Sequence, residues 1–145
     1  MYAKALTQVE AMKARTKRFA LRVPKLFRAL HQTEEARVIG HQMLRSGTSV
    51  GANYRAVCRA RSRREFVSKM NVVVEEADET VFWFELRIDG GIVPARRLSA
   101  LMGEGNELLA IFAASVRTVK KRLTPKGMSS NGSMTQSTPQ VRQED

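Results

Sequence analysis

The sequence predicts an all-α protein built as an antiparallel up-down-up-down four-helix bundle. Apolar residues recur at every third or fourth position in four successive stretches, the period of an amphipathic helix, and strand-type alternation is scarce. The links between the stretches are only a few residues long, so sequential helices are expected to be antiparallel neighbours. A chain of 145 residues, 43% of them hydrophobic, is long enough for one domain with its own core. We expect an N-terminal extension at 1–15, the bundle at 16–123 and a disordered C-terminal tail at 124–145.

The first stretch carries one apolar stripe within a basic surface. The stripe consists of Phe19, Val23, Leu26, Phe27 and Leu30. Pro24 lies in its middle, and an interior proline removes one backbone hydrogen bond and costs about 3 kcal/mol. We therefore expect either a kink at Pro24 or a helix that begins close to it.

The second stretch begins at Thr33, because threonine is a preferred helix N-cap. Glu34 and Glu35 follow in the first turn, where they suit the positive end of the helix dipole. The apolar period then runs without a break through Ile39, Met43, Ser46, Val50, Tyr54 and Val57. This unbroken period predicts one helix.

The third and fourth stretches have equally clear limits. Ser62 and Glu65 form a capping box at the start of the third stretch, and Gly90-Gly91 ends it. Its stripe consists of Phe66, Met70, Val73, Ala77, Thr80 or Val81, Phe84 and Ile88. After a link with Pro94, the fourth stripe consists of Leu98, Leu101, Gly105, Leu108, Phe112, Val116 and Val119. From Thr124 onward, large apolar side chains are too few to offset the entropy cost of ordering, which predicts disorder.

The segment 46-SGTSVGANY-54 has two interpretations. A phosphate-binding loop needs G-x-x-x-x-G-K-[ST] after a buried strand, whereas Gly47 and Gly51 are four residues apart and no lysine follows. The favoured interpretation is a helix whose small face lets another helix approach closely, with direct ligand contact as the alternative. Each glycine costs a helix about 1 kcal/mol relative to alanine, so a compensating contact is expected. We assign Gly47, Gly51, Asn53 and Tyr54 to packing or an interface.

The balance of charges predicts an anionic partner. Lys and Arg number 25 against 14 Asp and Glu, a net charge of +11, which favours nucleic acid or the acidic face of another protein. No aromatic residues are interleaved with the arginines, so contact with the phosphate backbone is favoured over base stacking. A solvated basic surface is the alternative. The predicted contacts to RNA or DNA, without sequence preference, are Arg18, Arg22, Lys25, Arg55, Arg59, Arg61, Arg63, Arg64 and Lys69.

An acidic run in the third stretch suggests ion pairing, a metal site or acid-base catalysis. A metal site in a helix bundle usually needs Glu-x-x-His pairs on facing helices, and neither His31 nor His41 stands in one. Ion pairing with an arginine-rich neighbouring helix or subunit is favoured. We therefore predict no catalytic residue, no metal and no cofactor. The residues assigned instead to packing or an interface are Glu76, Asp78, Glu79 and Trp83.

Cysteine usage and hydropathy limit the cellular setting. The single cysteine, Cys58, excludes an intrachain disulfide and a multi-cysteine zinc site. No apolar run approaches the roughly 20 residues that span a bilayer, and the first residues lack the apolar region of a secretory signal. These features predict a cytoplasmic protein with no membrane partner.

Three segments of the chain resemble one bacterial family of four-helix bundles. They are 44-LRSGTSVGANYRAVCRARSRREFVSKM-70, 75-EEADETVFWFEL-86 and 106-NELLAIF-112. The family includes the proteins encoded by intervening sequences in 23S ribosomal RNA genes and the Avd accessory proteins of diversity-generating retroelements. The similarity extends from about Phe19 to Arg122. The chain departs from the pattern at Arg87, where an apolar residue is common, and at Pro24, where an ordinary helix former is expected.

The resemblance implies a bundle that assembles into a homopentameric ring or barrel. In the Avd branch, a basic surface of the ring engages a reverse transcriptase and nucleic acid. The resemblance supplies no catalytic residue, because none is known to us for either branch.

Three functions remain candidates on the sequence alone. The leading one is a non-enzymatic, self-assembling protein that binds nucleic acid through phosphate contacts. The second is a protein-interaction scaffold, such as an accessory subunit of a reverse transcriptase or of an RNA-processing enzyme. The third is a metal-dependent hydrolase that uses Glu76 and Glu79. A helix-turn-helix regulator is disfavoured because the expected helices are too long for that compact motif.

Overall fold

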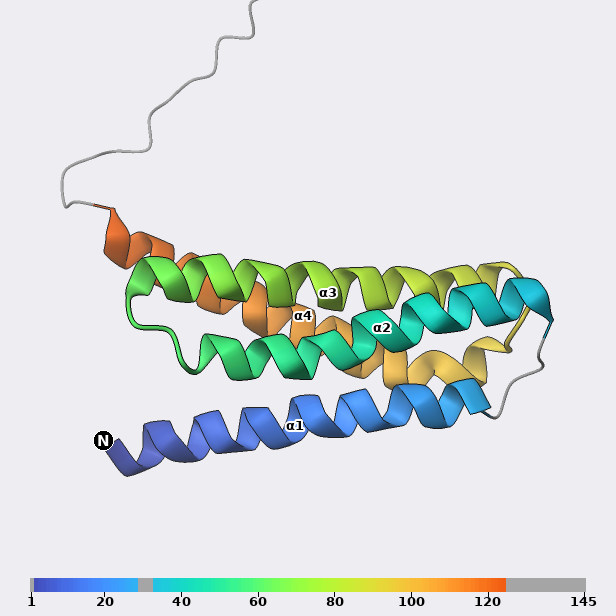
Figure 1. The fold of residues 1–145 in the computed structure, drawn as a ribbon, viewed down its shortest axis with the longest axis horizontal. Coiled ribbons are helices and arrows are strands. Elements are labelled where there is room, and N and C mark those ends of the chain that lie inside the picture. Colours follow the sequence, from blue (N-terminus) through green and yellow to red (C-terminus); the bar gives the residue numbers. More distant parts are fainter. Residues whose placement is uncertain (1, 29–32, 125–145) are drawn as a thin grey trace, which may run out of the picture.

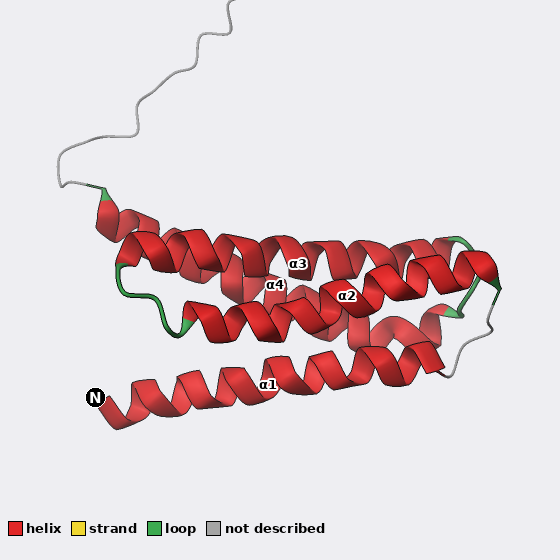
Figure 2. Ribbon diagram, in the orientation of Figure 1, coloured by secondary structure: helices red, strands yellow, loops and turns green. Residues whose placement is uncertain are grey.

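The computed structural model describes residues 2–28 and 33–124, with side chains from residue 7 onward. These residues form four helices, α1 (Tyr2–Arg28), α2 (Glu34–Val57), α3 (Arg63–Asp89) and α4 (Ala95–Leu123). The helices alternate in direction along the bundle (Figure 1), and the described part of the chain contains helices and loops but no strand (Figure 2). The predicted all-α antiparallel four-helix bundle is confirmed. The tail predicted at 124–145 lies, except for Thr124, outside the described residues.

The predicted caps fix the starts of α2 and α3. The Thr33 hydroxyl accepts a hydrogen bond from the backbone N–H of Ala36 at 3.2 Å, and the Ser62 hydroxyl accepts one from Glu65 at 3.0 Å. The Glu65 carboxylate accepts the backbone N–H of Arg61 at 3.3 Å, so a further free donor near the helix start is satisfied. At the other end of α3, Gly91 has a φ of +68°, a conformation that glycine adopts without strain.

Helix α1 begins much earlier than the sequence suggested. It is continuous from Tyr2 to Arg28 and contains Pro24, so the expectation of a helix start near Pro24 is wrong. Residues 2–15, expected as an extension, are the first half of this helix. Tertiary contacts hold this half in place: the Arg15 guanidinium lies 2.6 Å from the Glu104 carboxylate and 3.0 Å from that of Glu107, both on α4.

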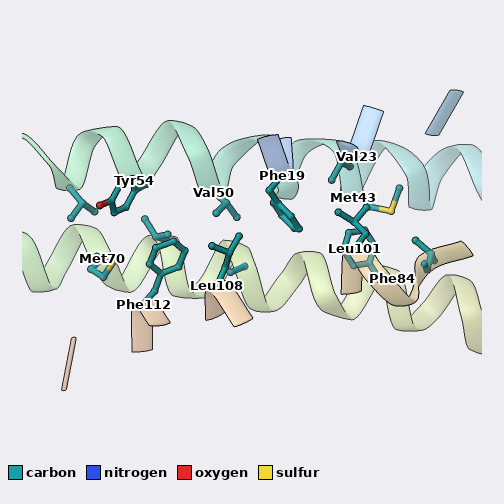
Figure 3. Packing of buried hydrophobic residues seen from close by; sticks show 14 of the residues in the cluster. Phe19, Val23, Met43, Val50, Tyr54, Met70, Phe84, Leu101, Leu108 and Phe112 are labelled. Carbon is teal, nitrogen blue, oxygen red and sulfur yellow. The ribbon is translucent and has the colours of Figure 1, made fainter. Parts of the chain in front are cut away.

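The buried core follows the predicted stripes. Figure 3 shows Phe19 and Val23 of α1 packed among residues of the other helices, including Met43, Val50 and Phe84. Two aromatic contacts between buried residues of this core join helices. The rings of Phe19 and Phe84 meet edge to face with centroids 6.3 Å apart, and those of Tyr54 and Phe112 stack at 5.7 Å. Predicted stripe residues from all four helices are therefore in the core, whereas Leu30 lies outside the described residues.

Small residues of α2 lie where α1 crosses it. A Cβ atom added at Gly47 would lie 2.8 Å from Cγ2 of Val23, and one added at Gly51 would lie 3.3 Å from the backbone oxygen of Thr16. The first distance is shorter than real Cβ contacts allow. The absence of a side chain at these positions lets the two helices approach each other, as the small-face interpretation of the segment expects.

We predict opposite effects of alanine at two helical glycines. Gly47→Ala should lower the free energy of unfolding, because the clash with β-branched Val23 outweighs the gain in helix propensity. Gly103→Ala should raise it by up to about 1 kcal/mol, because an added Cβ meets nothing within 4 Å in the described structure. Urea unfolding of both variants measures the difference. Stabilisation of similar size at both positions would contradict the close approach.

A charged side chain, that of Arg87 near the end of α3, is buried in the core. Arg87 is 1% exposed, and its Nη2 donates a hydrogen bond of 2.7 Å to the backbone oxygen of Ala36. Its Nε and Nη1 have no partner among the described residues. Gly40 makes the room, because a Cβ there would lie 2.6 Å from the Arg87 Nη2. Burial lowers the pKa of Arg87, since removing the charged form from water is costly.

We predict that Arg87→Met stabilises the fold. Methionine keeps most of the packing volume and removes a charge that the described structure pairs only with one carbonyl, so unfolding should cost about 1–3 kcal/mol more. Chemical denaturation measures this gain, and Arg87→Lys, which keeps a charge, should not show it. A marked loss of stability in Arg87→Met would instead indicate an acceptor outside the described residues.

Candidate nucleic-acid interface

Two of the predicted arginines lie in a basic hollow between α1 and α2. The hollow has a volume of about 510 Å³ and continues into a smaller one of about 280 Å³ that shares three of its cations. The larger hollow is lined by Arg55 near the end of α2, by Arg59 in the turn that follows α2, and by Lys13 and Lys17 from α1. Four cations therefore surround one surface depression, and we call it the basic hollow.

Among the described residues, Glu10 is the only acidic residue that lines the basic hollow. Its carboxylate lies 3.2 Å from Nζ of Lys13, and the two residues of this ion pair are about one turn apart on α1. Within the described part of the chain, Lys17, Arg55 and Arg59 form no ion pair, and all three side chains are exposed. Three cations thus remain available to an anion, which is the arrangement that attracts phosphate groups.

From the sequence, Lys13 and Lys17 were not predicted to lie beside these arginines. They stand four residues apart, which places them on the same side of a helix. Lys13 falls in the segment expected as an N-terminal extension, so no helix face was assigned to it. The continuous α1 helix supplies the missing information, since it carries both lysines alongside the end of α2.

The other predicted cations occupy different places. Arg18, Arg61 and Arg63 line a second depression, described below. Lys69 is engaged within α3, where its Nζ lies 2.9 Å from the Glu65 carboxylate. Arg64 is exposed in the first turn of α3, and Arg22 and Lys25 are exposed on the second half of α1. The nine predicted residues therefore do not form one patch.

The second depression is a groove of about 1040 Å³ between α1 and α4. These two helices touch least among neighbouring pairs, and Figure 1 shows them well apart at the end that carries the chain's N-terminus. The floor is apolar and includes Phe66, Met70 and Ile111. The rim carries five arginines and no acidic residue, namely Arg15, Arg18, Arg61, Arg63 and Arg122. We call it the arginine-rimmed groove.

Tyr54 forms part of the groove's inner wall. It is 8% exposed and stacks on Phe112, so it is mainly a core residue. Burial raises the pKa of Tyr54 above its usual range, and the neighbouring Cys58 thiol adds to the shift. Next to it in sequence, the Asn53 amide donates to the backbone oxygen of Ser49 at 2.9 Å, one turn earlier in α2.

The acidic run of α3 is partly neutralised by α2. The Arg45 guanidinium lies 3.4 Å from the Glu76 carboxylate and also pairs with that of Glu79. The Trp83 indole N–H donates to the same Glu79 carboxylate at 3.1 Å. These contacts hold the pKa of Glu79 below its usual range, with the Arg45 hydrogen bond as the largest cause. Asp78 is exposed, and within the described residues it forms no ion pair.

The geometry provides no cluster suited to a metal ion. No group of three or more His, Cys, Asp or Glu side chains comes together in residues 7–28 and 33–124. None of the described helices is long and apolar enough to cross a membrane. What the fold and the site define is a basic all-α bundle with a cationic hollow on one side and an apolar groove on another.

Comparison with known proteins places this bundle in a family. The profile of the 23S rRNA-intervening sequence proteins matches residues 10–114, and the chain belongs to that family. A solved structure of unknown function, from the S23 ribosomal protein family of Bacteroides thetaiotaomicron, is 31% identical with a TM-score of 0.67. The alignment covers 72% of this chain and 97% of that one. No curated protein matches. The resemblance read from the three sequence segments is confirmed for this branch.

The raised pKa of Tyr54 predicts a loss of stability in alkali. The neutral phenol is favoured in the folded state, so its contribution is complete below the unfolded pKa of about 10 and is lost as pH rises through the folded value. The free energy of unfolding should therefore fall by up to about 1.4 kcal/mol per pH unit between the unfolded pKa of about 10 and the raised pKa of the folded state, and this component should level off above it. Tyr54→Phe should lack this component, and urea unfolding at stepped alkaline pH measures it. Equal slopes for both proteins would contradict the assignment.

Proposed function

We propose that this protein is a non-enzymatic, self-assembling helical bundle of the cytoplasm that binds nucleic acid through phosphate contacts. The basic hollow carries the proposal, because Lys17 of α1, Arg55 of α2 and Arg59 of the following turn converge there without carboxylate partners among the described residues. Each cation that neutralises a phosphate releases condensed counterions, which favours binding of any sequence.

The lining of the basic hollow favours contact with the backbone rather than with bases. Among the described residues that form it, none is aromatic, so bases have no side chain on which to stack. Lysine and arginine at a surface depression contact phosphates and position a nucleic acid without reading its sequence. The family's name connects its members with intervening sequences of 23S rRNA, which makes RNA a natural first ligand to test.

The proposal assigns no catalytic role, because the acidic residues considered for one form ion pairs. Glu76 and Glu79, the pair considered for a hydrolase, both face Arg45, and an ion-paired carboxylate is a poor general base. We likewise propose self-assembly, and the resemblance to the wider family suggests five copies. An exposed acidic run on α3 and exposed cations on α1 give copies of the chain complementary charges.

Salt titration tests nucleic-acid binding. Affinity for a fluorescent RNA should fall steeply with salt concentration. In Arg55→Gln/Arg59→Gln, the slope of log K against log salt should become shallower by about 1.4 for a single strand or about 1.8 for a duplex, because two phosphate contacts are lost. Fluorescence anisotropy at several salt concentrations measures both quantities.

The matched control removes two arginines from the opposite end of the bundle. Arg96 and Arg97 are exposed in the first turn of α4, far along the bundle from the hollow (Figure 1). Arg96→Gln/Arg97→Gln lowers the net charge equally and should leave the slope nearly unchanged. No binding at low salt, or equal effects of the two double variants, would refute a phosphate site at the hollow.

A protein-interaction scaffold is the second candidate, and the arginine-rimmed groove favours it. An apolar floor with a cationic rim suits a protein partner better than a phosphate backbone, since nucleic acid offers no apolar ridge to fill it. An accessory subunit of a reverse transcriptase or RNA-processing enzyme is the partner class that we propose for this alternative. A complex that survives nuclease treatment would favour the scaffold over direct nucleic-acid binding.

A further inference from the structure

Helix α3 exposes a ridge that is both apolar and acidic. Val72, Phe82 and Leu86 are 41%, 50% and 37% exposed, high values for large apolar side chains. Glu75, Asp78 and Glu85 are exposed on the same side of the helix, because residues three, four and seven apart share a face. We call these six residues the α3 ridge. It extends from Val72 to Leu86, fifteen residues that span about 21 Å along the helix axis.

The charge of the ridge is uncompensated. From Val72 to Leu86, the sequence of α3 contains no Lys or Arg. Arg45 of α2 pairs with Glu76 and Glu79, at the edge of the ridge. Within the described residues, Glu75, Asp78 and Glu85 have no such partner. Exposed apolar groups flanked by unpaired charges of one sign are typical of a protein interface rather than of plain surface.

The arginine-rimmed groove is complementary to the ridge in charge and in apolar character. Its α1 wall, Gln8–Arg18, and its α4 wall, Ile111–Arg122, are each about 15 Å long, enough for nearly three helical turns. Its apolar floor matches the ridge's large side chains. Arg15 and Arg61 already pair with carboxylates of the same chain, so Arg18, Arg63 and Arg122 are the rim arginines that match the ridge's free acids. Among the described residues, no acid lines the groove and the ridge carries no base, so like charges do not oppose the contact.

We propose that the α3 ridge of one copy docks into the arginine-rimmed groove of a second copy. The inference rests on the proposed self-assembly and adds the two surfaces that perform it. The ridge is on α3, whereas the groove opens between α1 and α4, so the contact joins two different surfaces of the chain. Such a head-to-tail contact leaves a free ridge on one copy and a free groove on the other, and it continues until a ring closes.

The proposal divides the predicted nucleic-acid residues into two sets. Arg18, Arg61 and Arg63 line the groove and contact the ridge of the neighbouring copy. Arg55 and Arg59 line the basic hollow and stay accessible to phosphate. Substitutions in the first set therefore change assembly, whereas those in the second change nucleic-acid affinity at constant assembly.

Two surface variants test the docking. Phe82→Lys/Leu86→Lys places cations on the ridge opposite the arginines. Val9→Glu/Val119→Glu places acids in the groove at two partly exposed positions that lie outside the buried core cluster. After nuclease treatment, light scattering coupled to size exclusion should show an assembly for the wild type and the mass of one chain for each variant. Circular dichroism verifies that both variants stay helical.

A mixture of the two variants provides the sharper measurement. The ridge variant retains an intact groove, and the groove variant retains an intact ridge, so one contact can form and no more. The mixture should contain a complex of two chains. The matched control is Leu21→Lys/Val38→Lys, which replaces two exposed apolar residues, 62% and 59% exposed, that belong to neither surface. The control should keep the wild-type mass.

Several outcomes would overturn the docking and are distinguishable from failure of the proposed function. An assembled wild type whose mass neither variant alters would refute the ridge and groove but leave self-assembly standing. A ridge variant that dissociates beside an unaffected groove variant would indicate a symmetric ridge-to-ridge contact instead. A wild type that assembles only after removal of residues 125–145 would assign the groove to that segment. A monomeric wild type would refute self-assembly itself. The RNA titration would still test phosphate binding at the basic hollow independently.

Discussion

The close approach of α1 to α2 over Gly47 and Gly51 is the contact on which the placement of the charged surfaces depends. Because Gly47 has no side chain, Val23 packs against the α2 backbone, and Gly51 lets the backbone oxygen of Thr16 come close. Side by side at this distance, the two helices bring Lys17 next to Arg55 and so create the basic hollow. The same tight pairing draws α1 toward α2, and the first half of α1 is tied to α4 mainly through Arg15. Because α1 packs closely on α2 but makes few contacts with α4, the arginine-rimmed groove remains open between α1 and α4.

Charge in this bundle is separated by surface rather than scattered. Arg45 neutralises the side of the acidic run that faces α2, so the remaining acids of α3 point away from the bundle together with Phe82. The arginines at the turn between α2 and α3 divide between the hollow and the groove. Separation of this kind raises the free energy of the isolated chain through like-charge repulsion, and contact with an oppositely charged surface relieves it. Both the nucleic-acid proposal and the docking proposal use this relief.

Local pattern predicted the bundle well, because the stripes and caps are properties of single helices. Thr33, Ser62 and the apolar residues of α2 needed nothing beyond spacing and side-chain chemistry. The first half of α1 was not predicted from the sequence. A contact that ties this half to the bundle, the ion pair between Arg15 and Glu104, joins residues 89 apart in the sequence. Arg87 was noticed as unusual, but its burial depends on space at Gly40 in another helix. The groove has no local signature, since it arises where two helices distant in sequence, α1 and α4, make few contacts.

Assembly and nucleic-acid binding reinforce each other if the two surfaces are distinct. A single hollow offers three free cations, and a few phosphate contacts give weak, salt-sensitive binding. Several copies joined through ridge and groove would present one hollow each along a common surface. A nucleic acid that leaves one hollow then rebinds at the next at high effective concentration, so avidity exceeds the affinity of any one site. In this proposal, the arginines of the groove would contribute indirectly, because they would hold the copies together instead of competing for the same strand. With the roles separated in this way, one short basic turn would serve both proposed contacts. Arg59 lines the basic hollow, proposed for phosphate, and Arg61 lines the arginine-rimmed groove, proposed for the neighbouring copy.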